Sequence, residues 1–171
     1  DETVVDAEDR GAKVAAAVAE HALALMLTFT RRLHLLRDQQ TAKAWRPMLS
    51  DLTLREEELN GKTLLVVGLG RIGQRVAALG KAFGMRVLAT RRDETAGPGV
   101  KGAGAADAVY KFDRLKGLLP TADFVVLTCP LTPQTEGLID GGALALMKRT
   151  AYLINVARGK VVDEPPRRDM A

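Results

Sequence analysis

Cysteine, histidine and aromatic residues are all scarce in this chain of 171 residues. A single cysteine cannot form an internal disulfide, and together with two histidines far apart it leaves no group with the spacing of a metal site. Aromatic residues make up only 4% of the chain, so its core must be aliphatic. The scattered basic residues have no aromatic residues interleaved among them, which argues against nucleic acid as a partner.

The chain also lacks an uninterrupted apolar run of membrane-spanning length. The longest apolar stretch, Val14 to Thr30, contains Glu20 and His21. The first residues are acidic and lack the basic start of a secretory leader. We therefore expect a cytoplasmic protein that does not enter a membrane, and the single cysteine fits a reducing compartment.

The composition that is present is that of an ordinary globular domain. Hydrophobic residues make up 47% and charged residues 27%, with a net charge of +4. The mild positive charge favours anionic ligands such as phosphates. Residues 1–11 are polar and acidic, and we expect them to form a loose lead-in before the structured part of the chain.

A long helix is predicted over residues 12–37. Val14, Val18, Ala22, Leu25 and Phe29 recur at helical spacing, and further apolar residues make a second face. A helix that is apolar nearly all round must be buried on two sides. It is either a central core helix or a helix shared with a partner subunit, and the pattern alone favours neither.

The most informative stretch runs from Leu64 to Gly73. Four apolar residues read as a buried parallel strand, and they lead into the pattern G-x-G-x-x-G at Gly68, Gly70 and Gly73. A helix is predicted to follow, with its N-terminal amides directed at a pyrophosphate. The glycine pattern alone is weak, but its place between a strand and a helix favours a dinucleotide-binding site over a chance match.

The rest of the chain alternates between strands and helices. Further strands are predicted over 86–90, 109–110, 124–128 and 151–157, with a loop over 93–104. Helices are predicted over 71–83, capped by Gly84, over 113–119, with Asp113 as N-cap, and over 141–148. This alternation predicts an α/β fold, a Rossmann-type doubly wound parallel sheet with right-handed crossovers.

Two arginines stand where the second strand ends, in Thr90-Arg91-Arg92. In this fold an acidic residue usually ends the second strand and binds the adenosine ribose hydroxyls. An arginine cannot accept those hydrogen bonds, but it can pair with a 2′-phosphate. The sequence thus favours NADP(H) over NAD(H). The alternative is a pair of solvated surface arginines, with the cofactor held by other contacts.

Two more residues follow strands at the same edge. Arg158 comes just after the fifth strand, where a guanidinium can form a bidentate interaction with a carboxylate. Its alternative is a salt bridge to Asp163 or Glu164. Cys129 ends the fourth strand with no histidine nearby, so we expect a buried, unreactive thiol.

Five motifs occur together in an order and spacing that resemble one family. They are AVAEHALALML at 17–27, GLGRIG at 68–73, PLTPQT at 130–135, MK at 147–148 and NVARG at 155–159. This combination resembles the cofactor-binding domain of the D-isomer-specific 2-hydroxyacid dehydrogenases and covers roughly residues 11–164. We therefore expect a dinucleotide-binding domain over 12–164.

The resemblance implies a chemistry and a set of residues. Such enzymes transfer a hydride between nicotinamide and C2 of a small 2-hydroxy or 2-oxo acid, with a histidine as acid/base, a glutamate beside it and an arginine that matches Arg158. The family's ribose-binding acid falls on Arg91, and its dimer interface includes the helix at 12–37, which favours a homodimer. The cofactor-binding positions implied are Gly68, Leu69, Gly70, Arg71, Ile72, Gly73, Thr90, Arg91, Arg92, Cys129, Pro130, Thr135, Val156 and Ala157.

The chain departs from the family after Glu164. Residues 165–171 begin with two prolines and do not match the helix, glutamate and histidine expected there. We expect a sheet that is incomplete at its C-terminal side and a cofactor domain that binds NAD(P) without catalysing turnover. The alternative is a non-catalytic dinucleotide-sensing module that controls assembly.

Overall fold

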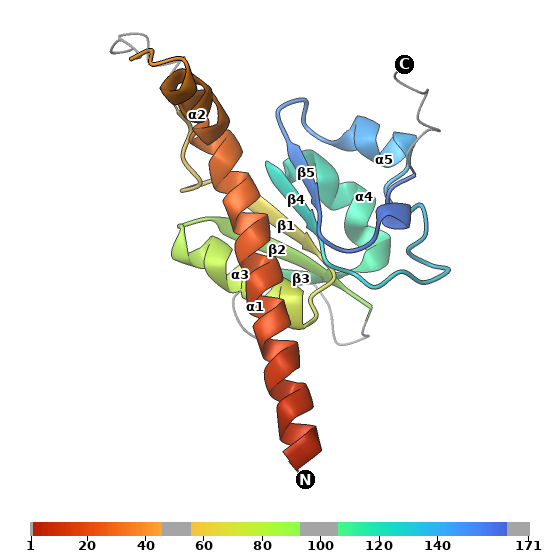
Figure 1. The fold of residues 1–171 in the computed structure, drawn as a ribbon. Helices are drawn as coiled ribbons and strands as arrows, with labels where there is room; N and C mark the ends of the chain where they lie inside the picture. Colours follow the sequence, from red (N-terminus) through yellow and green to blue (C-terminus); the bar gives the residue numbers. More distant parts are fainter. Residues whose placement is uncertain (1, 46–55, 93–105, 164–171) are drawn as a thin grey trace, which may run out of the picture.

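The computed structural model describes residues 2–45, 56–92 and 106–163, with side chains from residue 11 onward (Figure 1). The loop expected over 93–104 and the tail over 165–171 lie outside the described residues. Five parallel strands form one sheet in the order β3-β2-β1-β4-β5. The strands are β1 (Thr63–Val67), β2 (Arg86–Arg91), β3 (Ala108–Lys111), β4 (Phe124–Leu127) and β5 (Tyr152–Asn155).

Helices cover both faces of this sheet, which confirms the doubly wound α/β prediction (Figure 1). On one face lie α1 (Glu2–Thr30) and α3 (Arg71–Ala82), and on the other lie α4 (Leu115–Leu118) and α5 (Gly141–Leu146). A separate helix, α2 (Leu33–Thr41), continues from α1. Short 3-10 turns occupy Phe112–Arg114, Leu119–Thr121 and Gly159–Val161.

The central strand explains why its sequence is apolar at consecutive positions. Leu64 and Val66 belong to the core beneath α1 and α3, whereas Leu65 and Val67 belong to the core beneath α4 and α5. All four side chains are completely buried. A strand covered on both faces has no solvent side, so alternation with polar residues is lost.

The long helix differs from its prediction in extent. It begins at Glu2, so the loose lead-in expected over residues 1–11 is helical from Glu2 onward. Acidic residues near the N-terminus of a helix interact favourably with the helix dipole, which is consistent with this early start. The helix predicted over 12–37 is also interrupted, because Arg32 adopts a left-handed conformation with φ of 50° and separates α1 from α2.

The buried face of α1 is also not the predicted one. Ala15, Ala19, Ala22 and Met26 are buried against α3 and the sheet, whereas Val14 is 59% exposed. Of the predicted stripe at 14, 18, 22, 25 and 29, only Ala22 is fully buried. Alanines allow two helices to approach closely, so this contact selects small side chains rather than large ones. Within the described residues, α1 is therefore covered on one side only.

Two rings tie the end of α1 to the edge of the sheet. Tyr152 of β5 stacks between Phe29 of α1 and Phe124 of β4, with ring centroids 5.0 and 5.3 Å apart. In the part of the chain that the structure describes, β5 pairs with β4 alone and its other edge carries no strand. Whether the sheet is incomplete at this edge stays a prediction.

One stretch of α1, Gly11–Thr30, is long and apolar enough to cross a membrane by those two criteria alone. Glu20 and His21 interrupt the same stretch, which is why the sequence predicts a poor membrane span there. A helix of this kind near the N-terminus is weak evidence for a membrane span, because the core helix of a soluble protein meets the same criteria.

Of the two helix caps predicted from the sequence, one is confirmed and the other is wrong. Gly84 has φ of 71° and follows α3, where the amides of Gly84 and Met85 donate to Lys81 and Gly80 in a Schellman arrangement. Asp113 does not cap a helix, because it lies inside the 3-10 turn that begins after Lys111. A side-chain cap occurs at another helix, α5, where Asp140 Oδ1 accepts a hydrogen bond from the Ala143 amide at 2.6 Å. That helix ends at Leu146 because Met147 is extended.

Two aspartates connect strands at the amino edge of the sheet. Asp107 accepts the Val87 amide at 2.8 Å and the Lys81 ammonium at 2.7 Å. Asp123 does the same with the Thr63 amide at 2.8 Å and with Lys148 at 2.7 Å. For Asp107, the hydrogen bonds from Lys81 and Val87 lower the carboxyl pKa. Burial raises the pKa of Asp123, but its bonds from Lys148 and Thr63 outweigh that effect and hold the pKa below its ordinary value.

The lowered pKa values of Asp107 and Asp123 predict that the domain loses stability in acid. Because each pKa is lower in the folded state, the stabilisation is fully present above the unfolded pKa and is lost as the pH falls through the folded pKa, below about pH 4. Chemical denaturation of the parent and of a D107N/D123N double variant should give stability curves that differ at pH 7 and converge towards pH 3. A gap between the curves that stays constant with pH would contradict this assignment.

Candidate functional site

The turn after β1 is held by main-chain hydrogen bonds to β2 and within the turn itself. The amides of Gly68 and Leu69 both donate to the Thr90 carbonyl of β2, at 3.1 and 3.0 Å. The Gly70 amide then donates back to the Gly68 carbonyl at 2.9 Å, and α3 begins at Arg71. No side chain caps α3, so its first-turn amides are directed out of the helix towards the carboxyl edge of the sheet.

The three glycines of this turn meet three different requirements. A Cβ at Gly68, whose φ is 102°, would lie 2.7 Å from the Cys129 Cα atom. A Cβ at Gly73 would collide with the Gly68 carbonyl oxygen, so α3 can approach β1 only with glycine there. A Cβ at Gly70 would meet nothing within 4 Å. The middle glycine therefore leaves open space beside the main chain, as the approach of a phosphate requires.

A cavity of about 790 Å³ opens beside this turn, a size that accommodates a cofactor. It lies at the carboxyl ends of β1, β2 and β4, where ligands bind in doubly wound sheets. In the described part of the chain the lining contains two arginines and no carboxylate, which suits an anionic ligand. Its lining residues are Gly68, Leu69, Gly70, Arg91, Arg92, Phe112, Thr128, Pro130, Thr132, Gln134 and Thr135.

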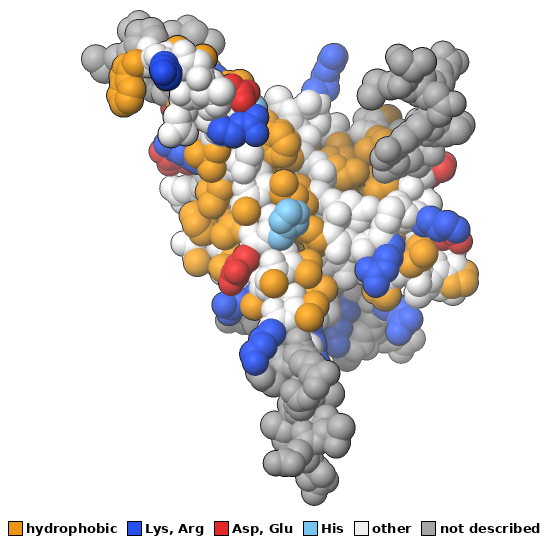
Figure 2. All heavy atoms as spheres, in the orientation of Figure 1, with side chains coloured by type: hydrophobic (Ala, Val, Ile, Leu, Met, Phe, Trp, Pro, Cys, Tyr) orange, Lys and Arg blue, Asp and Glu red, His pale blue; other side chains and the backbone are white. Residues whose placement is uncertain are grey.

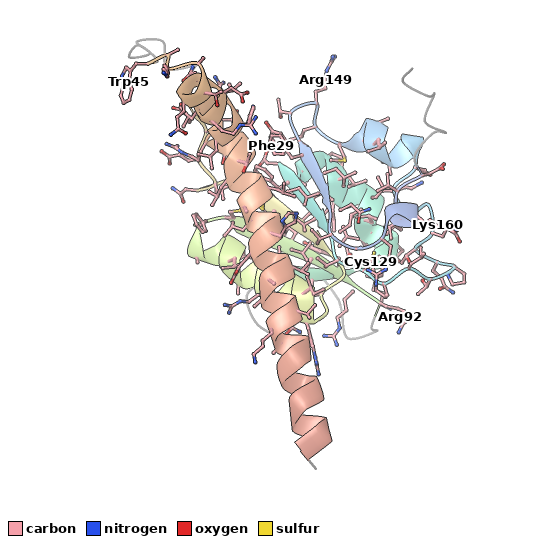
Figure 3. All side chains as sticks on the ribbon, viewed as in Figure 1. Phe29, Trp45, Arg92, Cys129, Arg149 and Lys160 are labelled. Carbon is pink, nitrogen blue, oxygen red and sulfur yellow. The ribbon has the colours of Figure 1, made fainter. Side chains whose placement is uncertain are left out.

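Seven of the cofactor positions expected from the sequence line this cavity. They are Gly68, Leu69, Gly70, Arg91, Arg92, Pro130 and Thr135. The seven others do not line it: Arg71, Ile72 and Gly73 form the first turn of α3, Thr90 and Cys129 are buried at strand ends, and Val156 and Ala157 follow β5. In Figure 3, Arg92 projects from the end of β2, whereas Cys129 lies inside the molecule.

Four lining residues were not identified from the sequence: Phe112, Thr128, Thr132 and Gln134. Thr132 and Gln134 belong to the PLTPQT motif that had been singled out as a whole. Phe112 directly follows β3 and Thr128 directly follows β4. The rule that ligands bind at the carboxyl ends of parallel strands could have identified these two residues.

Two buried threonines differ in how their hydroxyls are hydrogen-bonded. Thr135 donates from its hydroxyl to the Pro130 carbonyl at 2.6 Å and accepts the Thr132 amide at 2.8 Å. Its hydroxyl therefore shapes the 130–135 loop that walls the cavity. The Thr90 hydroxyl is buried and finds no hydrogen-bond partner among the described residues.

The Cys129 thiol is buried, and burial raises its pKa above the ordinary value. A thiol that is harder to ionise is a poor nucleophile, which agrees with the expected unreactive role.

Arg158 lies on an exposed loop after β5, away from the lining of the cavity. Its Nη1 donates to the Ala157 carbonyl at 2.8 Å, and within the described residues it forms no ion pair with Asp163. Glu164, its other expected partner, lies outside the described residues. The side chain of Asn155 fixes the loop by donating to the Arg158 carbonyl at 2.9 Å and accepting the Ala157 amide at 3.0 Å.

The chain combines a parallel sheet, a glycine turn into a helix and an arginine-lined cavity at the switch point beside β1. These features define a dinucleotide-binding domain of the Rossmann type. The family model described as D-isomer specific 2-hydroxyacid dehydrogenase, NAD binding domain, matches residues 23–166. The chain therefore belongs to the D-isomer-specific 2-hydroxyacid dehydrogenase family, as the sequence motifs predicted.

Curated relatives agree with this assignment. The chain is 41% identical over 154 residues to a glyoxylate reductase of Thermococcus kodakarensis, covering 86% of this chain and 43% of that protein. It is 42% identical over 146 residues to a D-3-phosphoglycerate dehydrogenase of Mycobacterium leprae, covering 85% of this chain and 26% of that protein. The chain thus spans less than half the length of these relatives.

Solved structures share the fold. A D-lactate dehydrogenase from Aquifex aeolicus, complexed with NAD and lactic acid, superposes with a TM-score of 0.71 at 41% identity, covering 85% of this chain and 41% of that one. A glycerate dehydrogenase related protein from Thermoplasma acidophilum gives a TM-score of 0.74 at 34% identity, covering 88% and 48%.

Proposed function

We propose that this domain binds NADP(H) in preference to NAD(H). The observation that carries the proposal is the lining of the cavity beside the glycine turn, which contains Arg91 and Arg92 and, among the described residues, no carboxylate. The first-turn amides of α3 would hold the pyrophosphate, and the open space at Gly70 admits it. Arg91, at the end of β2, would pair with the 2′-phosphate.

The domain would serve an oxidoreductase that transfers a hydride between nicotinamide and a small 2-hydroxy or 2-oxo acid. Relatives named glyoxylate reductase and D-3-phosphoglycerate dehydrogenase support this substrate class. When bound, the nicotinamide ring supplies or accepts the hydride. Arg158 would bind the substrate carboxylate, because it is exposed, pairs with no described acid and follows a strand of the same sheet. We place this activity in the cytoplasm.

Titration calorimetry with NADPH and NADH tests the cofactor proposal. The 171-residue chain should bind NADPH at least tenfold more tightly, a difference of about 1.4 kcal/mol. It should not oxidise NADPH with glyoxylate, hydroxypyruvate or pyruvate, because neither histidine lines the cavity to act as acid/base. Equal affinities would contradict the preference, and turnover would show that another group moves the proton.

We propose that the chain forms a homodimer through the outer faces of α1 and α2. Figure 2 shows apolar side chains along the outward face of α1. Val14 and Phe29 of α1 and Leu33 and Leu36 of α2 are all exposed in the single chain. Large apolar patches of this kind are typical of protein interfaces.

Val14→Glu should therefore convert the dimer into a monomer of 18.4 kDa, as measured by light scattering. Val14 is 59% exposed, so the change should leave the fold of each chain intact. Leu144→Glu, at an exposed leucine of α5, is the matched control and should remain dimeric. A parent chain that is already monomeric, or dissociation of both variants alike, would contradict the proposed interface.

A further inference from the structure

The peptide plane between Gly68 and Leu69 is held at both of its ends. Its amide end, the Leu69 N–H, donates to the Thr90 carbonyl at 3.0 Å. Its carbonyl end, the Gly68 oxygen, accepts the Thr128 hydroxyl at 2.6 Å. One bond comes from the end of β2 and the other from the end of β4, the two strands that flank β1.

We propose that Thr128 is a positioning residue for pyrophosphate binding, because its hydroxyl fixes the orientation of this peptide plane. The inference rests on the proposed function, in which the turn after β1 receives the pyrophosphate. Thr128 need not touch the ligand to act in this way. It fixes the Gly68 carbonyl, which accepts the Gly70 amide at 2.9 Å and so aligns it. Gly70 is the N-cap of α3.

The need for a side-chain donor follows from the flexibility of glycine. Gly68 has φ of 102° and no Cβ, so rotation of the following peptide plane meets little steric resistance. A flipped plane would turn the Gly68 oxygen towards the Thr90 carbonyl and away from the Gly70 amide, so the Gly70 amide would lose the acceptor that aligns it. The Thr128 hydroxyl opposes that rotation through a bond to oxygen that only the observed orientation permits.

Thr128 is itself rigidly placed. Its amide donates to the Val67 carbonyl at 2.9 Å, as a continuation of the pairing between β1 and β4. The hydroxyl also lies 3.3 Å from the Val67 carbonyl oxygen, so it is confined between two acceptors of the same turn. A β-branched side chain has few χ1 rotamers, so little entropy is lost in holding this geometry.

Thr128→Val keeps the shape of the side chain and removes the donor, and Thr128→Ser keeps the donor. Binding of ADP, which carries a pyrophosphate, is compared with binding of adenosine, which carries no phosphate. We expect T128V to weaken ADP about tenfold, the scale of one net hydrogen bond, and to change adenosine less than twofold. T128S should stay close to the parent for both ligands.

A purely structural role would weaken both ligands alike, and that result, or an unchanged affinity for ADP in T128V, would overturn the proposal. A second measurement needs no ligand: amide hydrogen exchange at Leu69 and Gly70 should be faster in T128V and unchanged in T128S. Unchanged exchange in T128V would also overturn it. If the parent fails to bind ADP, the proposed function is wrong, and the exchange rates still decide whether Thr128 orients the peptide plane.

Discussion

Gly73→Ala should destabilise the domain by about 3 kcal/mol and abolish dinucleotide binding. The added methyl group would collide with the Gly68 carbonyl oxygen and lie 2.9 Å from the Thr128 hydroxyl oxygen. Both atoms are fixed by the turn, so α3 must move away from β1. Movement of α3 also carries its first-turn amides out of line with the cavity. Denaturant unfolding and NADPH titration measure the two effects.

Variants at two other glycines distinguish an effect on folding stability from an effect on cofactor binding. Gly70→Val adds a side chain where a Cβ meets nothing within 4 Å, so folding should be preserved while the space for a phosphate is filled. Gly117→Ala, in α4, also meets nothing within 4 Å, and it should leave binding unchanged and stability equal or slightly higher. Full binding by the Gly73 variant, or unfolding of the Gly70 variant, would contradict the roles assigned to these glycines.

Arg91→Asp should reverse the cofactor preference. In the proposed site Arg91 pairs with the 2′-phosphate, so replacing its guanidinium by a carboxylate should weaken NADPH binding about 100-fold, or about 2.7 kcal/mol. The new carboxylate can accept hydrogen bonds from the ribose hydroxyls, so NADH should bind more tightly than to the parent. Dissociation constants for both cofactors, measured on parent and variant, give the ratio directly.

The matched control is Arg149→Asp, which makes the same change of charge. Figure 3 shows Arg149 projecting into solvent at the end of the molecule opposite Arg92. This variant should weaken both cofactors equally and only slightly, because charges so far apart are screened. If the ratio of the NADPH to the NADH dissociation constant changes similarly in both variants, the effect comes from net charge, and Arg91 is not the phosphate ligand.

The strands and the glycine turn could be predicted because local sequence determines them. A strand buried on both faces must be apolar throughout, and the packing of α3 against β1 demands glycine at Gly73. The wrong predictions concern choices made by tertiary contacts. The buried face of α1 is set by how closely α3 approaches, which favours Ala15 and Ala19 over the larger Val14.

Hydrogen-bonded side chains were the hardest to predict. Nothing near Thr128 in the sequence shows that its hydroxyl meets a carbonyl 60 residues earlier. Thr135 was expected to bind the cofactor, yet its hydroxyl bonds to Pro130 within its own loop. Whether it also contacts the cofactor stays a prediction. Partners of this kind depend on the folded positions of distant strands, which periodicity does not encode.

The two aspartates at the amino edge have a consequence for the opposite edge. Each bonds to an amide of a neighbouring strand, Asp107 to Val87 and Asp123 to Thr63, and so prevents the strands from sliding past one another. A slip of one residue would move a strand by about 3.3 Å and turn its side chains to the other face. The heights at which Thr128 stands beside the glycine turn and Phe112 stands beside Arg91 are therefore set at the far end of the sheet, by residues that do not line the cavity.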